Sequence, residues 1–347
     1  MFKVIITGGA GYIGIHTIVD LLSKGFSVIS IDNNCRSYKE ILQEARHITG
    51  HTIKNYPINL CDAKAVEQVF QENADAKAVI HFAAYKNVDE SVDQPLLYYK
   101  NNIFSLLNIL KNIQKFQIPY FIYSSSCSVY GIVNRLPVTE DTPLSNPESP
   151  YANTKRMGEE ITYDFSIANP CKAVLLRYFN PVGAHESGFI GEIPFYKSTN
   201  LFTVITQCAI GKKSKIIVFG NDYETSDGTC IRDYIHVMDI AEAHTKSLEY
   251  LIRQKKSEQK LCCETFNLGT GTGITVLEAL KAFERNTNQK LNYEIGQRRA
   301  GDIPAIYANN DKAMRELNWI PKRTIDEMML SAWKWEQKIP QFSWINH

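Results

Sequence analysis

The sequence lacks the features that place a chain in a membrane, on a secretory route or on nucleic acid. It has no apolar run of about 18 residues, the length that a spanning helix requires. The first strand-like segment starts at Phe2, which leaves no room for a signal peptide. The 38 Lys and Arg residues almost balance the 37 Asp and Glu residues, so no basic excess attracts DNA, RNA or an anionic membrane. We therefore expect no membrane and no nucleic-acid partner.

The cysteines also lack pattern. There are eight, with no C-x-x-C pair and no spacing with histidine that is typical of a metal site. Scattered thiols of this kind are typical of a reducing compartment, so we expect a cytoplasmic protein with free thiols and no metal. With 347 residues, of which 44% are apolar, the chain can bury at least one large core.

Short apolar runs alternate with helix-length amphipathic stretches in the first half of the chain. Strands are expected at residues 2–7, 27–31, 77–82, 120–124 and 172–177, with a first helix at 12–23. Continuous apolar strands separated by helices predict an α/β fold with a doubly wound parallel sheet, the Rossmann arrangement.

After about Asn180 the pattern changes. Residues 181–200 are rich in Gly, Pro and polar residues, which is typical of a long functional loop. Strands are then expected at 216–219 and 266–268, and helices at 237–250, 274–283 and 325–335. We expect two domains with a cleft between them: residues 1–180 with about 237–260, and a smaller α/β domain of 181–236 with about 261–347.

A glycine-rich turn lies between the first strand and the first helix. Gly8, Gly11 and Gly14 allow a tight turn, close backbone approach to a pyrophosphate and close packing of the helix on the strand. The helix N-terminus offers unpaired N–H groups to the phosphates. Asp32 ends the second strand, where a carboxylate can bind ribose hydroxyls and repel a 2′-phosphate. The turn thus predicts NAD binding, although Arg36 leaves NADP open.

Tyr151 and Lys155 are four residues apart on a predicted helix that has Ser149 as its cap and Pro150 at its first position. This spacing puts both side chains on one helix face. An ammonium beside a phenol favours the phenolate, as does the positive charge of a nearby oxidised nicotinamide. The pair is typical of proton transfer; the alternative is an exposed helix pair without chemistry.

Three serines, 124–126, lie at and just after the end of the strand expected at residues 120–124. At the carboxyl end of a central strand their hydroxyls face the crevice where α/β folds bind ligands. A serine there can hydrogen-bond a reacting oxygen. The alternative is a polar turn between strand and loop.

Together these segments resemble the UDP-glucose 4-epimerase branch of the extended short-chain dehydrogenase/reductase family. The resemblance runs from Val4 to about Trp335. The motifs that carry it are T-G-G-A-G-Y-I-G from Thr7, H-F-A-A-Y-K-N-V-D-E-S from His81, S-S-S-C-S-V-Y-G from Ser124, Y-A-N-T-K from Tyr151, L-L-R-Y-F-N-P-V-G-A-H from Leu175, F-G-N-D-Y from Phe219, D-G-T-C-I-R-D-Y-I-H-V from Asp227, R-A-G-D-I-P-A from Arg299 and R-E-L-N-W from Arg315.

The resemblance implies an isomerase that interconverts UDP-galactose and UDP-glucose. NAD would take hydride from C4 of the hexose and return it to the opposite face of a 4-keto intermediate. Tyr151 would be base and acid at the 4-hydroxyl, Ser126 would bind that oxygen, and Lys155 would hold the nicotinamide ribose and lower the pKa of Tyr151. The first domain would bind NAD, the second would bind the UDP-sugar, and the protein would be a homodimer.

The resemblance also implies two residue sets. The cofactor set is Gly8, Gly11, Tyr12, Ile13, Gly14, Asp32, Asn33, Asn59, Leu60, Phe82, Ala83, Ala84, Lys86, Asn101, Tyr151, Lys155 and Phe179. The substrate set is Lys86, Ser126, Tyr151, Asn180, Asn200, Leu201, Phe219, Arg232, Arg299, Asp302 and Ile306.

Two positions depart from the family pattern. Asn59 stands where the adenine-binding segment usually has aspartate; its amide oxygen can still accept a hydrogen bond. Ile306 stands where a tyrosine goes with unsubstituted hexoses and a small residue with N-acetylated ones. Isoleucine is neither, which leaves the acceptance of UDP-N-acetylhexosamines open.

Two other functions share much of this pattern. A sugar-nucleotide 4,6-dehydratase or decarboxylase needs a further acid or base, typically a carboxylate directly after the active-site hydroxyl, and Cys127 and Ser128 stand there instead. A non-catalytic binding protein on this scaffold would be expected to lose Tyr151, Lys155 or Ser126, and all three are present.

Overall fold

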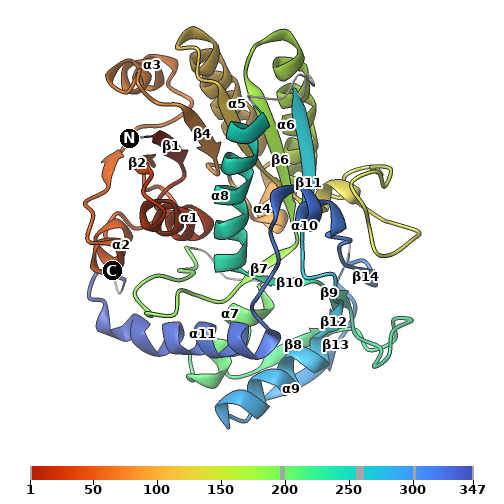
Figure 1. The fold of residues 1–347 in the computed structure, drawn as a ribbon. Helices are drawn as coiled ribbons and strands as arrows, with labels where there is room; N and C mark the ends of the chain where they lie inside the picture. The colour runs from red at the N-terminus through yellow and green to blue at the C-terminus, as the bar shows by residue number, and fades with distance from the viewer. Residues whose placement is uncertain (1, 196–199, 255–261, 300–301, 346–347) are drawn as a thin grey trace.

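A seven-stranded parallel sheet is the centre of the computed structural model, which describes residues 2–195, 200–254, 262–299 and 302–345 (Figure 1). The strand order is β11-β6-β5-β4-β1-β2-β3, and each neighbouring pair is parallel. Its strands are β1 (Lys3–Thr7), β2 (Ser27–Ile31), β3 (Lys54–Tyr56), β4 (Ala78–His81), β5 (Tyr120–Ser126), β6 (Lys172–Tyr178) and β11 (Cys263–Leu268). The order reverses direction between β1 and β4, which makes this the switch point where α/β sheets bind ligands.

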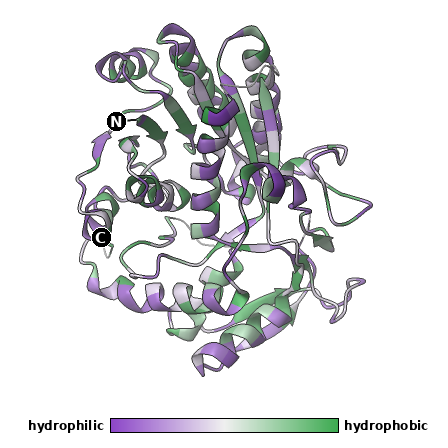
Figure 2. Cartoon of the chain, in the orientation of Figure 1, coloured by the Kyte–Doolittle hydropathy of each residue, from purple (hydrophilic) through white to green (hydrophobic). Residues whose placement is uncertain are grey.

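Helices cover both faces of the sheet. Alternate residues of β1 explain how: Val4 and Ile6 join one core cluster, and Ile5 joins the other, because successive side chains of a strand point to opposite faces. The helices are α1 (Tyr12–Ser23), α2 (Ile41–Thr49) and α8 (Val237–Gln254) on one face, and α3 (Ala63–Glu72), α5 (Pro95–Lys115) and α6 (Pro150–Ala168) on the other. The strands are largely apolar and the outer helix faces hydrophilic (Figure 2). The predicted doubly wound fold is confirmed.

A smaller unit packs at the carboxyl end of this sheet (Figure 1). Its own core contains Val218, Phe283 and Met329. Its strands are β7 (Asn180–Val182), β8 (Ile216–Phe219), β9 (Ile231–Arg232), β10 (Tyr234–His236), β12 (Ile274–Thr275), β13 (Tyr293–Gly296) and β14 (Ala305–Ile306), and its helices are α7 (Leu201–Ala209), α9 (Val276–Thr287) and α11 (Ile325–Lys338). The remaining elements are α4 (Val88–Asp93), α10 (Asp311–Leu317) and the 3-10 turns Cys127–Tyr130 and Ile339–Gln341.

The predicted division into two domains stays a prediction, with one correction. The second segment of the expected second domain began at about 261, but β11 pairs with β6 and belongs to the central sheet. Phe266 and Leu268 pack into the same core as Leu176, and a short apolar run does not itself show which sheet will take it. The expected boundary at residue 260 lies outside the described residues. Within the described parts of the chain, no helix is long and apolar enough to cross a membrane.

Candidate active site

The glycine turn connects β1 to α1 and leaves room beside its backbone. Gly8 has a φ of +70°, and its N–H donates to the Ile31 carbonyl at 2.8 Å. A Cβ added at Gly14 would collide with the Gly8 carbonyl. A Cβ added at Gly11 would lie 3.1 Å from the same carbonyl oxygen and, among the described residues, would have no other neighbour within 4 Å. Among the described residues no side chain caps α1, so its first N–H groups face this space. The turn therefore fits a pyrophosphate.

The adenosine side of this space is formed at the ends of β2 and β3. Asp32 accepts hydrogen bonds from the Ala10 N–H at 3.1 Å and the Asn34 N–H at 2.9 Å. Burial raises the pKa of Asp32, and these hydrogen bonds act against it. Asn33 and Asn59 each use their side-chain oxygen to accept from the N–H two residues later, at 3.1 and 2.9 Å. The loop is thus ordered before a ribose arrives, and Leu60 is buried beside it.

Tyr151, Ser126 and Lys155 meet where α6 crosses the end of β5. α6 begins at Pro150 with the Ser149 hydroxyl accepting from the Ala152 N–H at 3.2 Å, as predicted. Ser126 is the last residue of β5, and its hydroxyl acts on the Tyr151 phenol to lower the pKa of that phenol. The Lys155 ammonium donates to the Ser124 carbonyl at 2.6 Å and lies 6.0 Å from the centre of the Tyr151 ring. The structure thus brings the predicted catalytic set together.

Burial is the largest influence on the pKa values of Tyr151 and Lys155. Burial raises the pKa of Tyr151 to about 12, with the Ser126 hydrogen bond acting against it. Burial lowers the pKa of Lys155 to about 8, with the charge of Glu159 acting against it. The Lys155 ammonium donates to a carbonyl rather than to the phenol, and the lowering of the Tyr151 pKa expected from Lys155 together with an oxidised nicotinamide stays a prediction. A further positive charge would be needed to favour the phenolate.

Arg232 and Arg299 share the Asp302 carboxylate. Their Nη2 atoms lie 3.3 and 2.8 Å from the same Asp302 oxygen. The Arg299 guanidinium also lies 5.7 Å from the centre of the Phe219 ring, which is 43% exposed. Cys127 follows Ser126 in the chain. Burial raises the pKa of the Cys127 thiol to about 12, and the positive charge of Arg232 acts against this rise. Four predicted substrate residues thus form one group beside the catalytic set.

Lys86 and Asn200, predicted to bind ligands, are joined by a carboxylate that the sequence did not reveal. The Lys86 ammonium donates to Glu192 at 2.8 Å, and the Asn200 amide donates to its other oxygen at 3.1 Å. Burial opposes ionisation of Glu192, but the charge of Lys86 holds its pKa below the usual value. Glu192 lies in the predicted loop of residues 181–200, where no periodicity indicates which side chains turn inward.

The remaining predicted residues lie between these groups. An added Cβ at Gly8 would come 2.8 Å from the Ala83 nitrogen, so the segment after β4 with Phe82, Ala83 and Ala84 touches the glycine turn. Phe179 and Ile306 are buried in one cluster, and Ile306 pairs with Arg232 in the β14–β9 ladder.

The other predicted residues lie on or near named elements. The Tyr12 hydroxyl donates to the Gly183 carbonyl at 2.6 Å. Asn101 donates to Asn102 at 3.0 Å. Asn180 lies on β7, Leu201 begins α7, and Ile13 is in the first turn of α1.

A buried ion pair lies behind the catalytic helix. Glu159 accepts from Arg177 Nη2 at 2.6 Å and Nε at 2.9 Å, and from the Ser125 hydroxyl at 2.5 Å. Glu159 follows Lys155 by one turn of α6, so extending the Tyr151–Lys155 spacing by four residues would have found it. Arg177 is on β6, and only the fold brings it to α6.

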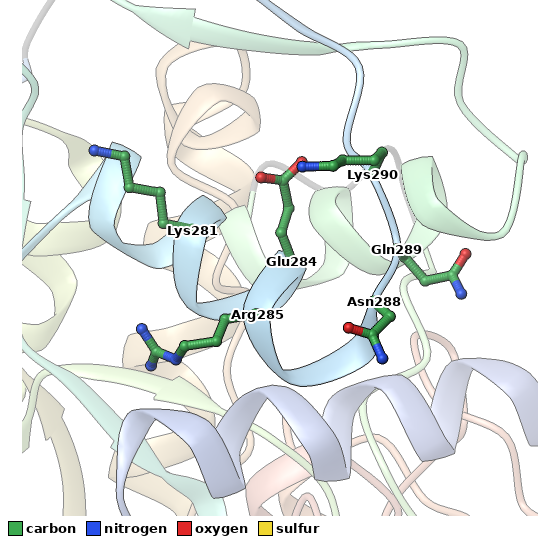
Figure 3. Close-up of a pocket in the computed structure, with 6 residues that line it drawn as sticks. All are labelled: Lys281, Glu284, Arg285, Asn288, Gln289 and Lys290. Atoms are coloured by element: carbon green, nitrogen blue, oxygen red, sulfur yellow. The ribbon is translucent and has the colours of Figure 1, made fainter.

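A separate pocket of about 340 Å³ lies at the C-terminal end of α9 (Figure 3). It is lined by Lys281, Glu284, Arg285, Asn288, Gln289 and Lys290. None of the predicted site residues lines it. We therefore place the candidate active site at the switch point of the sheet and not in this pocket.

Arg36, the residue that left NADP binding open, is bound to a carboxylate of the same chain. Its two terminal nitrogens donate to the two oxygens of Glu90 at 2.6 and 2.8 Å. A guanidinium held in this way is not directed at a 2′-phosphate, whereas Asp32 stands where a ribose hydroxyl would bind. The structure therefore favours NAD over NADP.

A doubly wound domain with this turn and a Tyr-x-x-x-Lys helix is the fold of the extended short-chain dehydrogenases/reductases. The model of one family, GDP-mannose 4,6 dehydratase, matches residues 5–331. A UDP-glucose 4-epimerase of Bacillus subtilis (strain 168) is 45% identical over 334 residues, 96% of each chain. The chain belongs to this family and, within it, to the UDP-glucose 4-epimerases.

Solved structures agree with this assignment. A UDP-glucose 4-epimerase from Bifidobacterium longum, in complex with NAD+ and UDP, has a TM-score of 0.91 and 43% identity, and the match covers 97% of this chain and 99% of that one. The UDP-Glc/GlcNAc 4-epimerase of Campylobacter jejuni has a TM-score of 0.83 and 35% identity, over 97% of this chain and all (100%) of that one.

Proposed function

We propose that this chain interconverts UDP-galactose and UDP-glucose with NAD, and that Tyr151 is the group that moves the proton of the sugar 4-hydroxyl. The observation that carries the proposal is the meeting of Tyr151, Lys155 and the end of β5 at the switch point of the sheet: the Lys155 ammonium lies 6.0 Å from the centre of the Tyr151 ring and donates to the Ser124 carbonyl, two residues before Ser126. When bound, NAD supplies the acceptor and donor of hydride for C4 and a positive charge beside the phenol.

The chain's own residues would do the rest. Tyr151 takes the proton of the 4-hydroxyl and returns it to the same oxygen, while Ser126 holds that oxygen by a hydrogen bond. Lys155, protonated at neutral pH, orients the ribose next to it. Arg232 and Arg299 are suited to the diphosphate, because a guanidinium matches phosphate geometry. Fixing the diphosphate leaves the hexose free to turn over and present its other face.

Elimination is less well supported. A dehydratase needs an acid or base next to the active-site hydroxyl, and Cys127 follows Ser126 here. Burial raises the pKa of the Cys127 thiol to about 12, so it stays protonated and is a poor base. The family model bears a dehydratase name, but this position favours the epimerase.

Ile306 is the observation that favours a wider substrate range. It is smaller than tyrosine, it is buried next to Phe179 and Arg232, and a neighbour at 35% identity is a UDP-Glc/GlcNAc 4-epimerase. We include UDP-N-acetylhexosamines as candidate substrates on this ground.

A homodimer in the cytoplasm is the assembly that we propose. Apolar side chains are exposed along α5 and α6, among them Leu96 (81%), Phe104 (57%) and Ile167 (56%). Apolar side chains exposed on two helices that pack against each other are suited to a protein–protein interface. All eight cysteines are free, which is compatible with a reducing compartment. Light scattering on a Phe104→Asp variant tests the dimer; a shift to monomer mass is expected.

Proton NMR of UDP-galactose with purified protein tests the reaction. We expect the anomeric signal of UDP-glucose to grow until the mixture is at equilibrium, and Tyr151→Phe to slow this by about 10²–10⁴-fold. Tyr293→Phe, a change on exposed β13, is the matched control and should leave the rate unchanged. A spectrum that stays unchanged after NAD and then UDP-N-acetylgalactosamine are added would refute the proposal.

A further inference from the structure

Side chains connect the loop after β2 to the segment after β4. The Arg36 guanidinium forms the two-pronged pair with Glu90 and lies 3.4 Å from the centre of the Tyr85 ring. Only 19% and 18% of the Arg36 and Glu90 side chains are exposed. A sheltered, bidentate and stacked arginine is a much stronger contact than an ordinary surface ion pair.

Both ends of this contact are held in place. On one side, the buried Tyr98 hydroxyl donates to Glu90 at 2.7 Å, and the Asn87 side chain caps the helix that carries Glu90. On the other side, Asp32 accepts from the Ser37 hydroxyl at 3.0 Å, which orders the loop that contains Arg36. The pair is therefore positioned by the fold and costs little to form.

The topology decides what this contact crosses. β2 and β4 are the two neighbours of β1 in the sheet, and neighbouring strands lie about 4.8 Å apart. A contact between the segments that follow β2 and β4 therefore joins the chain on the two sides of the carboxyl end of β1. That end is where the glycine turn begins and where the proposed NAD site lies.

We propose that Arg36, Tyr85 and Glu90 form a clasp across the cofactor groove, which must open for NAD to enter or leave. The proposal rests on the NAD site of the proposed function. It gives Arg36 and Glu90 a role that none of the catalytic residues has: they set the speed of cofactor exchange and leave the affinity almost unchanged.

Exchange rates distinguish this clasp from a direct contact with the cofactor. A barrier that both directions must cross changes the association and dissociation rate constants by the same factor, so Kd stays the same. A lost contact raises the dissociation rate constant and Kd together. Opening one charge-assisted pair is expected to speed exchange about tenfold, equivalent to about 1.4 kcal/mol.

The experiment compares wild-type protein with Glu90→Gln and Arg36→Met. NAD association is followed by stopped-flow protein fluorescence, and release is followed after mixing the loaded protein with excess ADP-ribose. We expect both rate constants to rise about tenfold in each variant, with Kd unchanged within about threefold. Glu264→Gln is the matched control: its pair with Lys312 is equally sheltered, at 24% and 26%, but joins β11 to α10. It should exchange NAD at the wild-type rate.

Three results would overturn the clasp. Unchanged exchange in both variants would show that the pair does not obstruct the groove. Faster release with unchanged association would show a direct cofactor contact instead. Equal acceleration in the Glu264→Gln control would show general loosening of the fold. A wild-type protein that binds no NAD would refute the proposed function itself, before any variant is compared.

Discussion

The buried pair of Glu159 and Arg177 gives the sharpest test of how the fold supports the site. Glu159 is on α6 one turn after Lys155, and Arg177 is on the adjacent β6, with 6% and 7% of their side chains exposed. Solvent cannot screen a charge left alone there. Replacing one partner, as in Glu159→Gln, is therefore expected to cost about 3–5 kcal/mol in the free energy of unfolding.

Urea unfolding at pH 7 and constant NAD concentration measures this cost. The double variant Glu159→Leu/Arg177→Met removes both charges. It should therefore be more stable than the less stable of the two single variants, Glu159→Leu and Arg177→Met. Glu294→Gln is the control, because its pair with Lys215 is about half exposed and should be worth less than about 1 kcal/mol. If Glu159→Gln lost less than about 1 kcal/mol, or if the two single costs simply added, the reasoning would be wrong.

Three further predictions concern specificity, substrate binding and pH. Ile306→Tyr should lower turnover of UDP-N-acetylgalactosamine relative to UDP-galactose by about tenfold, because the larger ring fills the space beside the hexose; an unchanged ratio in parallel NMR assays would contradict this. Glu192→Gln should raise the KM for UDP-galactose about tenfold with kcat within about twofold, since it loosens two predicted binding residues; a fall in kcat alone would argue against it. Lowering the pH from 7 to 5.5 should cost about 4 kcal/mol of stability, because burial lowers the pKa of His16 and His81 to about 3 and of His244 to about 4. At pH 5.5 these imidazoles are protonated in the unfolded state but neutral in the folded state, so the free energy of unfolding decreases as the pH falls. Equal urea midpoints at the two pH values would exclude this.

Local patterns predicted the parts of this protein that local interactions determine. β2 and α1 have the expected bounds, and β1 begins one residue later than expected, at Lys3, because these apolar runs end at clear turns. The cap at Ser149 and the proline after it predicted the start of α6 to the residue. The glycine turn was visible because its function depends on backbone geometry, which glycine spacing reveals directly.

Contacts between distant segments were beyond such patterns. Lys86 was predicted as a ligand-binding residue, but its partner Glu192 is 106 residues away in a loop without periodicity. The strand β11 was expected in the second domain because a run of six residues does not reveal which sheet edge is open to it. The helix spacing predicted that Lys155 lies near Tyr151, but spacing does not reveal that the Ser124 carbonyl accepts a hydrogen bond from the ammonium.

The cations around the site share a feature that bears on how it works. Arg232 and Arg299 share Asp302, and Lys86 is paired with Glu192. Each carboxylate fixes its cation in position, so little side-chain entropy is lost when a phosphate arrives, but it also reduces the positive charge that the phosphate meets. In the proposed function the sugar turns over while the diphosphate stays fixed; guanidinium groups held in this way would orient the diphosphate without binding it so tightly that product release becomes slow. The same logic explains why the carboxylates, and not only the cations, belong to the functional part of this chain.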